Sequence, residues 1–428
     1  MEILNSYNLI IASSTILILS FFFGEISKRT NIPSVLMLIV LGIMLKFALD
    51  AVGGGGFDFL PILEVLGIVG LIMIVLEAAL ELELKKEKLL PIGKAMAIAL
   101  IGLIGSAYVA AVILFQFIPE MTVQKAWIYA TPLSILSSAI IIPSVRTLSD
   151  KKREFHIYES TFSDIIGIMM FYFLEAQFLA SLSHDGGHSG GLMEFGGTLL
   201  LTIGISLVAS YLIILIFQNI KSHTKLFLLI AVLLLLYAVG KKMHLSSLII
   251  ILIFGLVIAN MKLFFQGRLG KWLHLEKAEE IYEGLHTITM ESAFVVRTFF
   301  FVVFGITITL ASLANVTVAL VSGLILISIY AIRFILLRIF MGKDILPQLF
   351  IAPRGLITVL LFYAIPIEAN VPNFDPGILF FIIICTSIIM TLALIFDKRR
   401  TGKALRKAEE NPIAYVKWKA PVVREEEL

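Results

Sequence analysis

Stretches of about 18 or more apolar residues recur along nearly the whole chain, and this pattern limits the fold more than any other feature. A run of that length crosses the hydrocarbon core of a bilayer as an α-helix. Of the 428 residues, 59% are hydrophobic and 15% are charged, whereas a soluble domain carries about 25% charged residues. The sequence therefore predicts an all-α polytopic membrane protein and not a soluble domain with one or two cores.

Thirteen spans can be placed on the chain, with boundaries set to within a few residues. Two of them, 225–240 and 245–262, are short and close together, so a count of twelve stays open. The predicted spans cover residues 7–23, 33–49, 59–80, 91–117, 125–145, 157–182, 193–218, 225–240, 245–262, 289–310, 315–340, 345–365 and 377–396.

Basic residues in the loops test this count, because Lys and Arg accumulate on the cytoplasmic side of a membrane. The loops after even-numbered spans hold only Lys125, Lys241 and Lys242. The loops after odd-numbered spans and the tail hold many more, among them Lys28, Arg29, Lys85, Lys86, Lys88, Lys94, Arg146, Lys151, Lys152, Arg153, Lys221, Lys225, Lys262, Arg268, Lys271, Lys277, Arg338 and Lys343. The alternation predicts thirteen spans, an external N-terminus and a cytoplasmic C-terminus. Since the basic residues lie between spans, the net charge of +3 does not indicate nucleic-acid binding.

We expect one transmembrane domain over residues 1–400, interrupted by a cytoplasmic amphipathic linker at 263–288 and followed by a short charged tail at 401–428. The chain begins Met1-Glu2-Ile3, without a basic region or a cleavage site, so the first span is expected to be retained. The single cysteine, Cys385, cannot form an internal disulfide. No motif for ATP or a redox cofactor is present, so no cofactor is expected and any transport would run on ion gradients.

The sixth predicted span places the carboxylates of Glu159 and Asp164 within the membrane, where an ionisable group costs about 2.5–3.5 kcal/mol and therefore indicates function. Glu159 and Asp164 are five residues apart, so their side chains point about 140° apart around the helix and cannot act as a pair. Ser163 shares a face with Glu159 instead. The alternative for Glu159 is a solvated position at the cytoplasmic interface.

Three arginines also fall within predicted spans. Arg333, in the eleventh span, is expected to pair with Glu159, although its long side chain could also reach the interface unaided. Arg297, in the tenth span, has Glu77 as a plausible counter-charge, with Glu64 as the alternative. Arg354 lies in the twelfth span.

Prolines interrupt two spans and predict broken helices, whose freed carbonyls and helix ends can hold an ion. The fifth span contains Ser134, Ser137 and Ser138 between Pro132 and Pro143. The twelfth span reads Ala352-Pro353-Arg354-Gly355-Leu356. The second break occurs seven spans after the first, as an inverted repeat would place it. A kink packed by neighbouring helices is the alternative for each.

A glycine-rich external loop contains His184, Asp185 and His188, but no further ligands accompany them. We therefore expect no metal site.

In this order, the motifs resemble those of the monovalent cation:proton antiporter superfamily, which includes sodium/proton exchangers and potassium-efflux antiporters. Its thirteen-span members carry Glu-x-x-x-Asn-Asp on the sixth span, which appears here as Glu159 to Asp164. Arg333 matches the arginine that pairs with this glutamate, and the segment around Arg354 matches a Gly- and Arg-rich element of the twelfth span. The resemblance implies two bundles, a dimerisation part and an ion-carrying core with two broken crossing helices, and a homodimer in the bilayer.

Two departures concern the choice of cation. Leu136-Ser137-Ser138-Ala139-Ile140 replaces the Thr-Asp-Pro of the exchangers and is closer to the potassium-efflux antiporters. Ser163 replaces the asparagine before the essential aspartate. The sequence therefore does not separate Na⁺ from K⁺.

The predicted mechanism is exchange of a monovalent cation for H⁺ at Asp164, with alternating access and one titrating group, so the exchange would be electroneutral. Burial disfavours the charged carboxylate and a bound cation favours it, so cation and proton compete. Oxygen ligands would come from freed carbonyls and from Ser134, Ser137, Ser138 and Ser163. A cation channel and a proton-coupled solute symporter stay as alternatives. An enzyme is not expected, since no nucleophile–base pair or HExxH motif is present.

Overall fold

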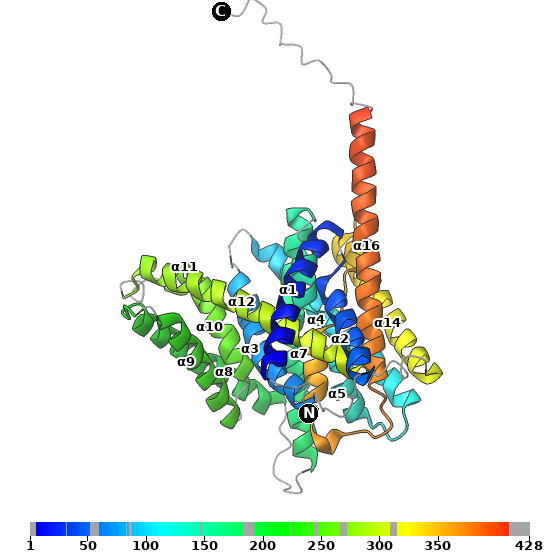
Figure 1. Ribbon diagram of the computed structural model, residues 1–428. Helices are drawn as coiled ribbons and strands as arrows, with labels where there is room; N and C mark the ends of the chain where they lie inside the picture. The colour runs from blue at the N-terminus through cyan, green and yellow to red at the C-terminus, as the bar shows by residue number, and fades with distance from the viewer. Residues whose placement is uncertain are drawn as a thin grey trace, which may run out of the picture.

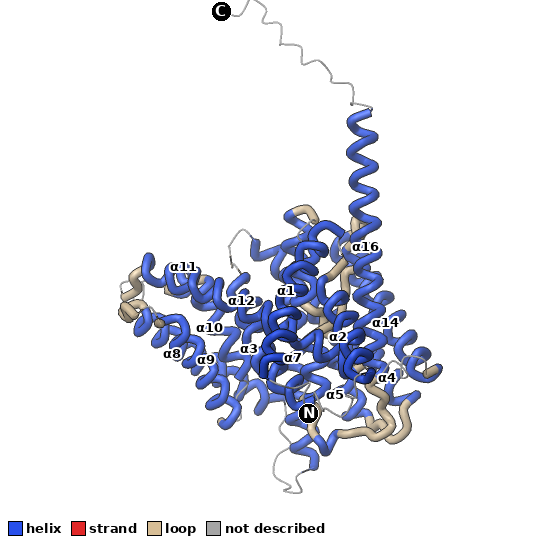
Figure 2. Tube along the Cα trace, in the orientation of Figure 1, coloured by secondary structure: helices blue, strands red, loops and turns tan. Residues whose placement is uncertain are grey.

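The structure is a computed structural model that describes residues 6–30, 32–51, 60–82, 84, 88–145, 148–182, 192–222, 224–243, 247–265, 272–308 and 315–410. Over these residues the regular secondary structure is entirely helical, without a β-strand (Figure 1, Figure 2). The predicted all-α fold is confirmed.

The helices follow the predicted spans, and two of those spans are broken into shorter helices. Their bounds are α1 (Ser6–Thr30), α2 (Ser34–Ala51), α3 (Leu60–Glu81), α4 (Leu89–Phe117), α5 (Val123–Ser134), α6 (Ser138–Ser144), α7 (Asp150–Leu182), α8 (Leu192–Phe217), α9 (Lys225–Lys242), α10 (Ser247–Ala259), α11 (Met261–Phe264), α12 (Leu275–Thr307), α14 (Val316–Met341), α15 (Leu356–Tyr363) and α16 (Gly377–Glu410). A short 3₁₀ helix, η5, covers Gln348–Phe350.

Nine helical segments of the described chain are long and apolar enough to cross a membrane. The protein is therefore an integral multi-pass membrane protein, while the number thirteen stays a prediction.

Part of the expected linker is continuous with the next span. Residues 275–288 form the first half of α12, which runs without a break to Thr307. The amphipathic segment and the tenth span are thus one helix of 33 residues. At the other end of the chain, α16 continues to Glu410, into the segment expected to be the tail.

The helices form two bundles, as their contacts and Figure 1 show. In the first, here called the scaffold bundle, α12 packs on α1, α2 and α3, while α10 packs on α3, α8 and α9. In the second, the core bundle, α4 packs on α5, α7 and α14, and α14 packs on α16. The short helices α6 and α15 contact α7 and complete the core bundle.

Small residues bring the backbones of α2 and α12 into direct contact, as in many membrane helix pairs. A Cβ added to Gly305 would lie 2.9 Å from Cα of Gly42, so neither position has room for a side chain. Earlier in α12, the hydroxyl of Thr298 lies 2.6 Å from the hydroxyl of Ser20 on α1.

The two bundles meet along α3, which contacts α7 and α15 of the core bundle. Gly67 of α3 packs directly against the side chain of Leu360 on α15. The scaffold bundle therefore lies beside the broken helices, where the candidate site is built.

Candidate ion-transport site

The first broken helix consists of α5 and α6, separated by residues 135–137, of which Ile135 and Ser137 are in extended conformation. Pro132 lies in the last turn of α5 and Pro143 in the last turn of α6. At this break, three successive backbone N–H groups donate to partners outside α5. They belong to Leu136, Ser137 and Ser138. Buried N–H groups need partners, so the groups that satisfy them define the site.

The second broken helix crosses the first at this point. Residues 351–355 separate η5 from α15 without helical structure. The N–H of Ser137 donates to the carbonyl of Pro353 at 2.9 Å, which joins the two breaks directly. Gly355 makes the close approach possible, since a Cβ there would lie 2.5 Å from Oγ of Ser137.

Helix α7 supplies the other two acceptors. Oγ of Ser163 accepts from the N–H of Leu136 at 3.0 Å, and Oδ2 of Asp164 accepts from the N–H of Ser138 at 3.3 Å. The side-chain hydroxyl of Ser138 also interacts with the carboxylate of Asp164 by hydrogen bonding. Asp164 is 3% exposed, and its second oxygen, Oδ1, has no hydrogen-bond partner among the described residues. One carboxylate oxygen is thus fixed at the crossing, and the other has no hydrogen-bond partner within the described part of the chain.

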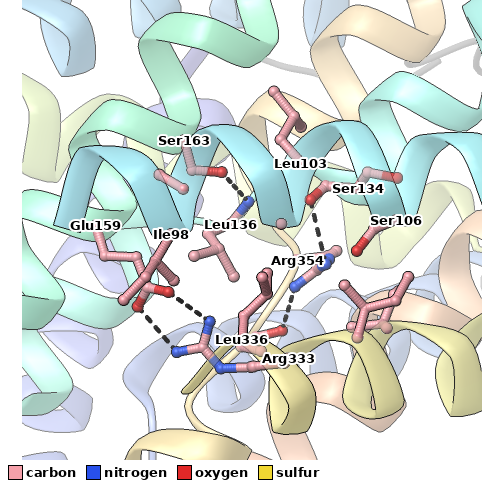
Figure 3. Close-up of a pocket in the computed structure, with 15 residues that line it drawn as sticks. Ile98, Leu103, Ser106, Ser134, Leu136, Glu159, Ser163, Arg333, Leu336 and Arg354 are labelled. Atoms are coloured by element: carbon pink, nitrogen blue, oxygen red, sulfur yellow. Dashed lines mark hydrogen bonds and ion pairs between the residues drawn. The ribbon is translucent and has the colours of Figure 1, made fainter. Parts of the chain in front are cut away.

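Glu159 and Arg333 form a bidentate ion pair within the core bundle (Figure 3). Nη1 of Arg333 lies 2.7 Å from Oε1 of Glu159, and Nη2 lies 2.9 Å from Oε2. Nε of the same arginine donates to the carbonyl of Gln348 at 3.0 Å. Glu159 is 1% exposed and Arg333 is 7% exposed, so the pair is buried within the protein.

Arg354 caps the end of α5. Its guanidinium donates to the carbonyls of Leu133 at 3.0 Å, Ser134 at 3.2 Å and Ala352 at 2.7 Å. Its backbone N–H donates to the hydroxyl of Thr386 at 3.1 Å. The positive charge therefore lies at the negative end of the α5 dipole and bridges both broken helices.

This cap changes the expected role of the freed carbonyls. Those of Leu133 and Ser134 at the end of α5 bind Arg354 and are not left for an ion. The hydroxyl of Ser134 donates to the carbonyl of Ala130 within its own helix. Ser134 thus lies beside Arg354, whereas Ser137, Ser138, Ser163 and Asp164 meet at the crossing.

A cavity of about 30 Å³ lies between the ion pair and Arg354 (Figure 3). Its polar lining includes Ser106, Ser134, Glu159, Arg333 and Arg354, and its other wall is the apolar face of α4. This volume suffices for a small number of water molecules.

The comparisons with known proteins agree with this architecture. The profile described as "Sodium/hydrogen exchanger, transmembrane" matches residues 15–396. The chain belongs to the sodium/hydrogen exchanger family. The family is one of cation:proton antiporters, so this exchanger is a transporter and not an enzyme.

Solved structures extend the likeness to the fold. The sodium proton antiporter MjNhaP1 of Methanocaldococcus jannaschii at pH 8 superposes with a TM-score of 0.64 and 19% identity, covering 90% of this chain and 97% of that chain. An electron-microscopy structure of the same antiporter gives a TM-score of 0.62 and 18% identity, covering 95% and 99%. No curated protein sequence gave a match.

A second cavity of the exchanger, of about 40 Å³, lies between the two bundles. Glu77 and Glu81 of α3 and Arg297 of α12 line it from the scaffold bundle, and Ser138 lines it from the core bundle. Nη2 of Arg297 lies 3.4 Å from Oε1 of Glu77, so the structure brings these two residues together. Because Ser138 also binds Asp164, this cavity adjoins the crossing.

Other sequence expectations fall outside what the structure describes. His184, Asp185 and His188 lie in the segment 183–191, and the side chain of Glu64 is not described. Within the described residues, no group of three or more His, Cys, Asp or Glu could hold a metal ion. Sequence reasoning missed His156, whose Nδ1 lies 3.4 Å from Oε2 of Glu159. The one available signal was its position one helical turn before that glutamate.

Proposed function

We propose that this exchanger moves a monovalent cation, Na⁺ or K⁺, in exchange for H⁺, with both ions competing for Asp164. The observation that carries the proposal is the buried carboxylate with one fixed and one unpartnered oxygen. An uncompensated charge at this depth is costly. Either a proton or a monovalent cation neutralises it, so one occupant excludes the other.

The surroundings of Asp164 support hard-cation chemistry. Hard cations prefer oxygen ligands, and the hydroxyls of Ser137, Ser138 and Ser163 belong to residues at the crossing. Glu159 is the carboxylate of α7 nearest to Asp164 in the sequence, and Arg333 balances its charge with two hydrogen bonds. Among the described residues, Asp164 is therefore the one uncompensated carboxylate at the crossing, which favours an electroneutral one-for-one exchange.

Alternating access would come from movement of the core bundle against the scaffold bundle. The hydrogen bond between the two breaks supports movement of the crossing as one piece. The protein would act as a homodimer in the bilayer. The N-terminus would be external and the C-terminus cytoplasmic, because basic residues accumulate in the loops predicted to lie on the C-terminal side. Opposite sides for the two termini agree with Figure 1, where α1 begins and α16 ends at opposite ends of the molecule.

The test is proton movement in vesicles that contain the purified full-length protein and a pH-sensitive dye. Pulses of NaCl or KCl should each be compared with choline chloride, and an antiporter should move protons in response to its cation. A cation current without proton movement would instead indicate a channel. Proton movement that required an organic solute would indicate a symporter.

A further inference from the structure

His156 is a buried titratable side chain that the proposed exchange does not use. Its side chain is 0% exposed, and neither ring nitrogen has a hydrogen-bond partner among the described residues. A neutral imidazole carries one N–H donor and one acceptor, so such burial leaves both groups unsatisfied. An unsatisfied polar side chain in a native core calls for an explanation.

The ring is directed at the ion pair. Nδ1 lies 3.4 Å from Oε2 of Glu159, the oxygen that also accepts from Nη2 of Arg333. The charged groups that act on the imidazole are Glu159 and Lys152 on its own helix and Arg333 on α14. Lys152 is held by Asp344 at 3.0 Å, so Glu159 is the only anion acting directly on His156 among these groups.

Protonation of this imidazole would change the charge of the whole cluster. With neutral His156, the charges of Glu159 and Arg333 cancel. A protonated ring places a second cation against the same carboxylate, so the cluster gains a net positive charge and Arg333 has a competitor for Oε2. Because α7 carries both this cluster and Asp164, a moving core bundle would then carry an additional buried charge.

We propose that His156 is a positioning residue for Glu159 and that protonation of its imidazole slows exchange at acid pH. The inference rests on the proposed function. The relevant pH is that of the side at which α7 begins, since Lys152, one turn before His156, is 24% exposed there.

The test measures maximal exchange rate at saturating cation, with pH varied on the side where α7 begins and held constant on the other. Competition between proton and cation at Asp164 alters the apparent cation affinity, whereas a second titrating group lowers the maximal rate. In the wild type this rate should fall about tenfold between about pH 8 and pH 4.5, mostly toward the acid end, because burial disfavours the charged imidazole. His156→Gln keeps a hydrogen-bond donor but cannot titrate, so it should match the wild type at pH 8 and lose this fall.

Two further variants separate positioning from packing. His156→Phe fills the site but lacks the ring nitrogen that faces Oε2 of Glu159 at 3.4 Å, so it should be slower at every pH, and a wild-type rate in this variant would overturn the positioning role. His274→Gln removes an exposed histidine at the start of α12 and should keep the acid-side fall. If the fall persists in His156→Gln, the inference is wrong.

If His156→Gln does not fold, ¹⁵N-imidazole NMR of the wild type gives the second measurement. Titration of His156 over the same range as the fall supports the proposal, and no titration overturns it. A wild type that moves no protons in response to cations would contradict the proposed function itself.

Discussion

Two carboxylates of α7, those of Glu159 and Asp164, lie in contrasting surroundings. Glu159 has both oxygens bound by Arg333 and lines the cavity that Arg354 also lines. Asp164, five residues later, has one oxygen bonded to the backbone of the break and no arginine bound to it within the described part of the chain. One helix thus holds a carboxylate whose charge is fully compensated beside one whose charge is not. We therefore propose that the first carboxylate contributes stability and that the second carries out ion exchange.

The strongest test of this contrast is Asp164→Asn. An amide can coordinate a cation but cannot carry a proton, so we expect cation-coupled proton movement to fall to the level of empty vesicles. Thermal stability in detergent should be close to that of the wild type. Glu175→Gln makes the same change three turns further along α7 and should retain exchange. Retained activity in Asp164→Asn, at equal protein content, would refute the assignment.

Glu159 should show the opposite behaviour, with a large effect on stability. Removal of one partner of a buried ion pair costs about 3–5 kcal/mol, because the other charge is left uncompensated. Glu159→Gln and Arg333→Gln should each lower the melting temperature in detergent, and the double variant should lose less than the sum.

The control is Lys262→Gln, which breaks the exposed pair with Glu279 and should cost about 1 kcal/mol or less. Additive losses at Glu159 and Arg333 would show that their interaction contributes no stability.

Arg354 lies across the cavity from the ion pair and should also contribute to stability. Lysine keeps the charge but lacks the planar fork that reaches three carbonyls. Arg354→Lys should therefore cost about 1.5–3 kcal/mol, the range for hydrogen bonds to a charged group. Arg338→Lys is the matched control, since Arg338 donates to the carbonyl of Gly342 at the surface. Equal melting temperatures for the two variants would exclude a capping role.

The serines of the first break should have a smaller effect, confined to the Asp164 side. Changing both Ser137 and Ser138 to Ala removes two hydroxyls and leaves the backbone N–H groups in place. At about 1 kcal/mol for a hydrogen bond, the apparent cation constant should rise about fivefold with little change in stability. Ser144→Ala, in α6, removes a hydroxyl that donates to the carbonyl of Ile140 within its own helix and serves as control. An unchanged cation constant would make the break purely structural.

The smallest effect is expected from membrane potential. If only Asp164 titrates, the core bundle has the same charge with a proton or a cation, and exchange is electroneutral. Moving one net charge across 100 mV would be worth about 2.3 kcal/mol. We therefore expect less than a twofold (about 0.4 kcal/mol) change in rate across that range in vesicles clamped with an ionophore. A steep dependence would show that a second group titrates, with Glu159 examined first.

Much of the fold could be predicted because the bilayer imposes span length and polarity on the chain. The break at Pro132 to Pro143 was visible for the same reason, since proline interrupts the helical hydrogen bonding. The cap by Arg354 could not be predicted. The carbonyls that an arginine reaches depend on how two distant segments cross. His156 was missed because it precedes the predicted span and its burial follows from packing on other helices.

The large sequence separation between partners in the site has a consequence for biosynthesis. Glu159 is made 174 residues before Arg333, so a ribosome adding about 5–20 residues per second separates the two by roughly 9–35 s. The interval is longer for the carbonyls at the end of α5, since Arg354 follows Leu133 by 221 residues. During this interval the first half of the protein holds charges and carbonyls whose partners do not yet exist. The site is therefore completed only when the last third of the chain enters the membrane, and a protein truncated before Arg354 cannot assemble it.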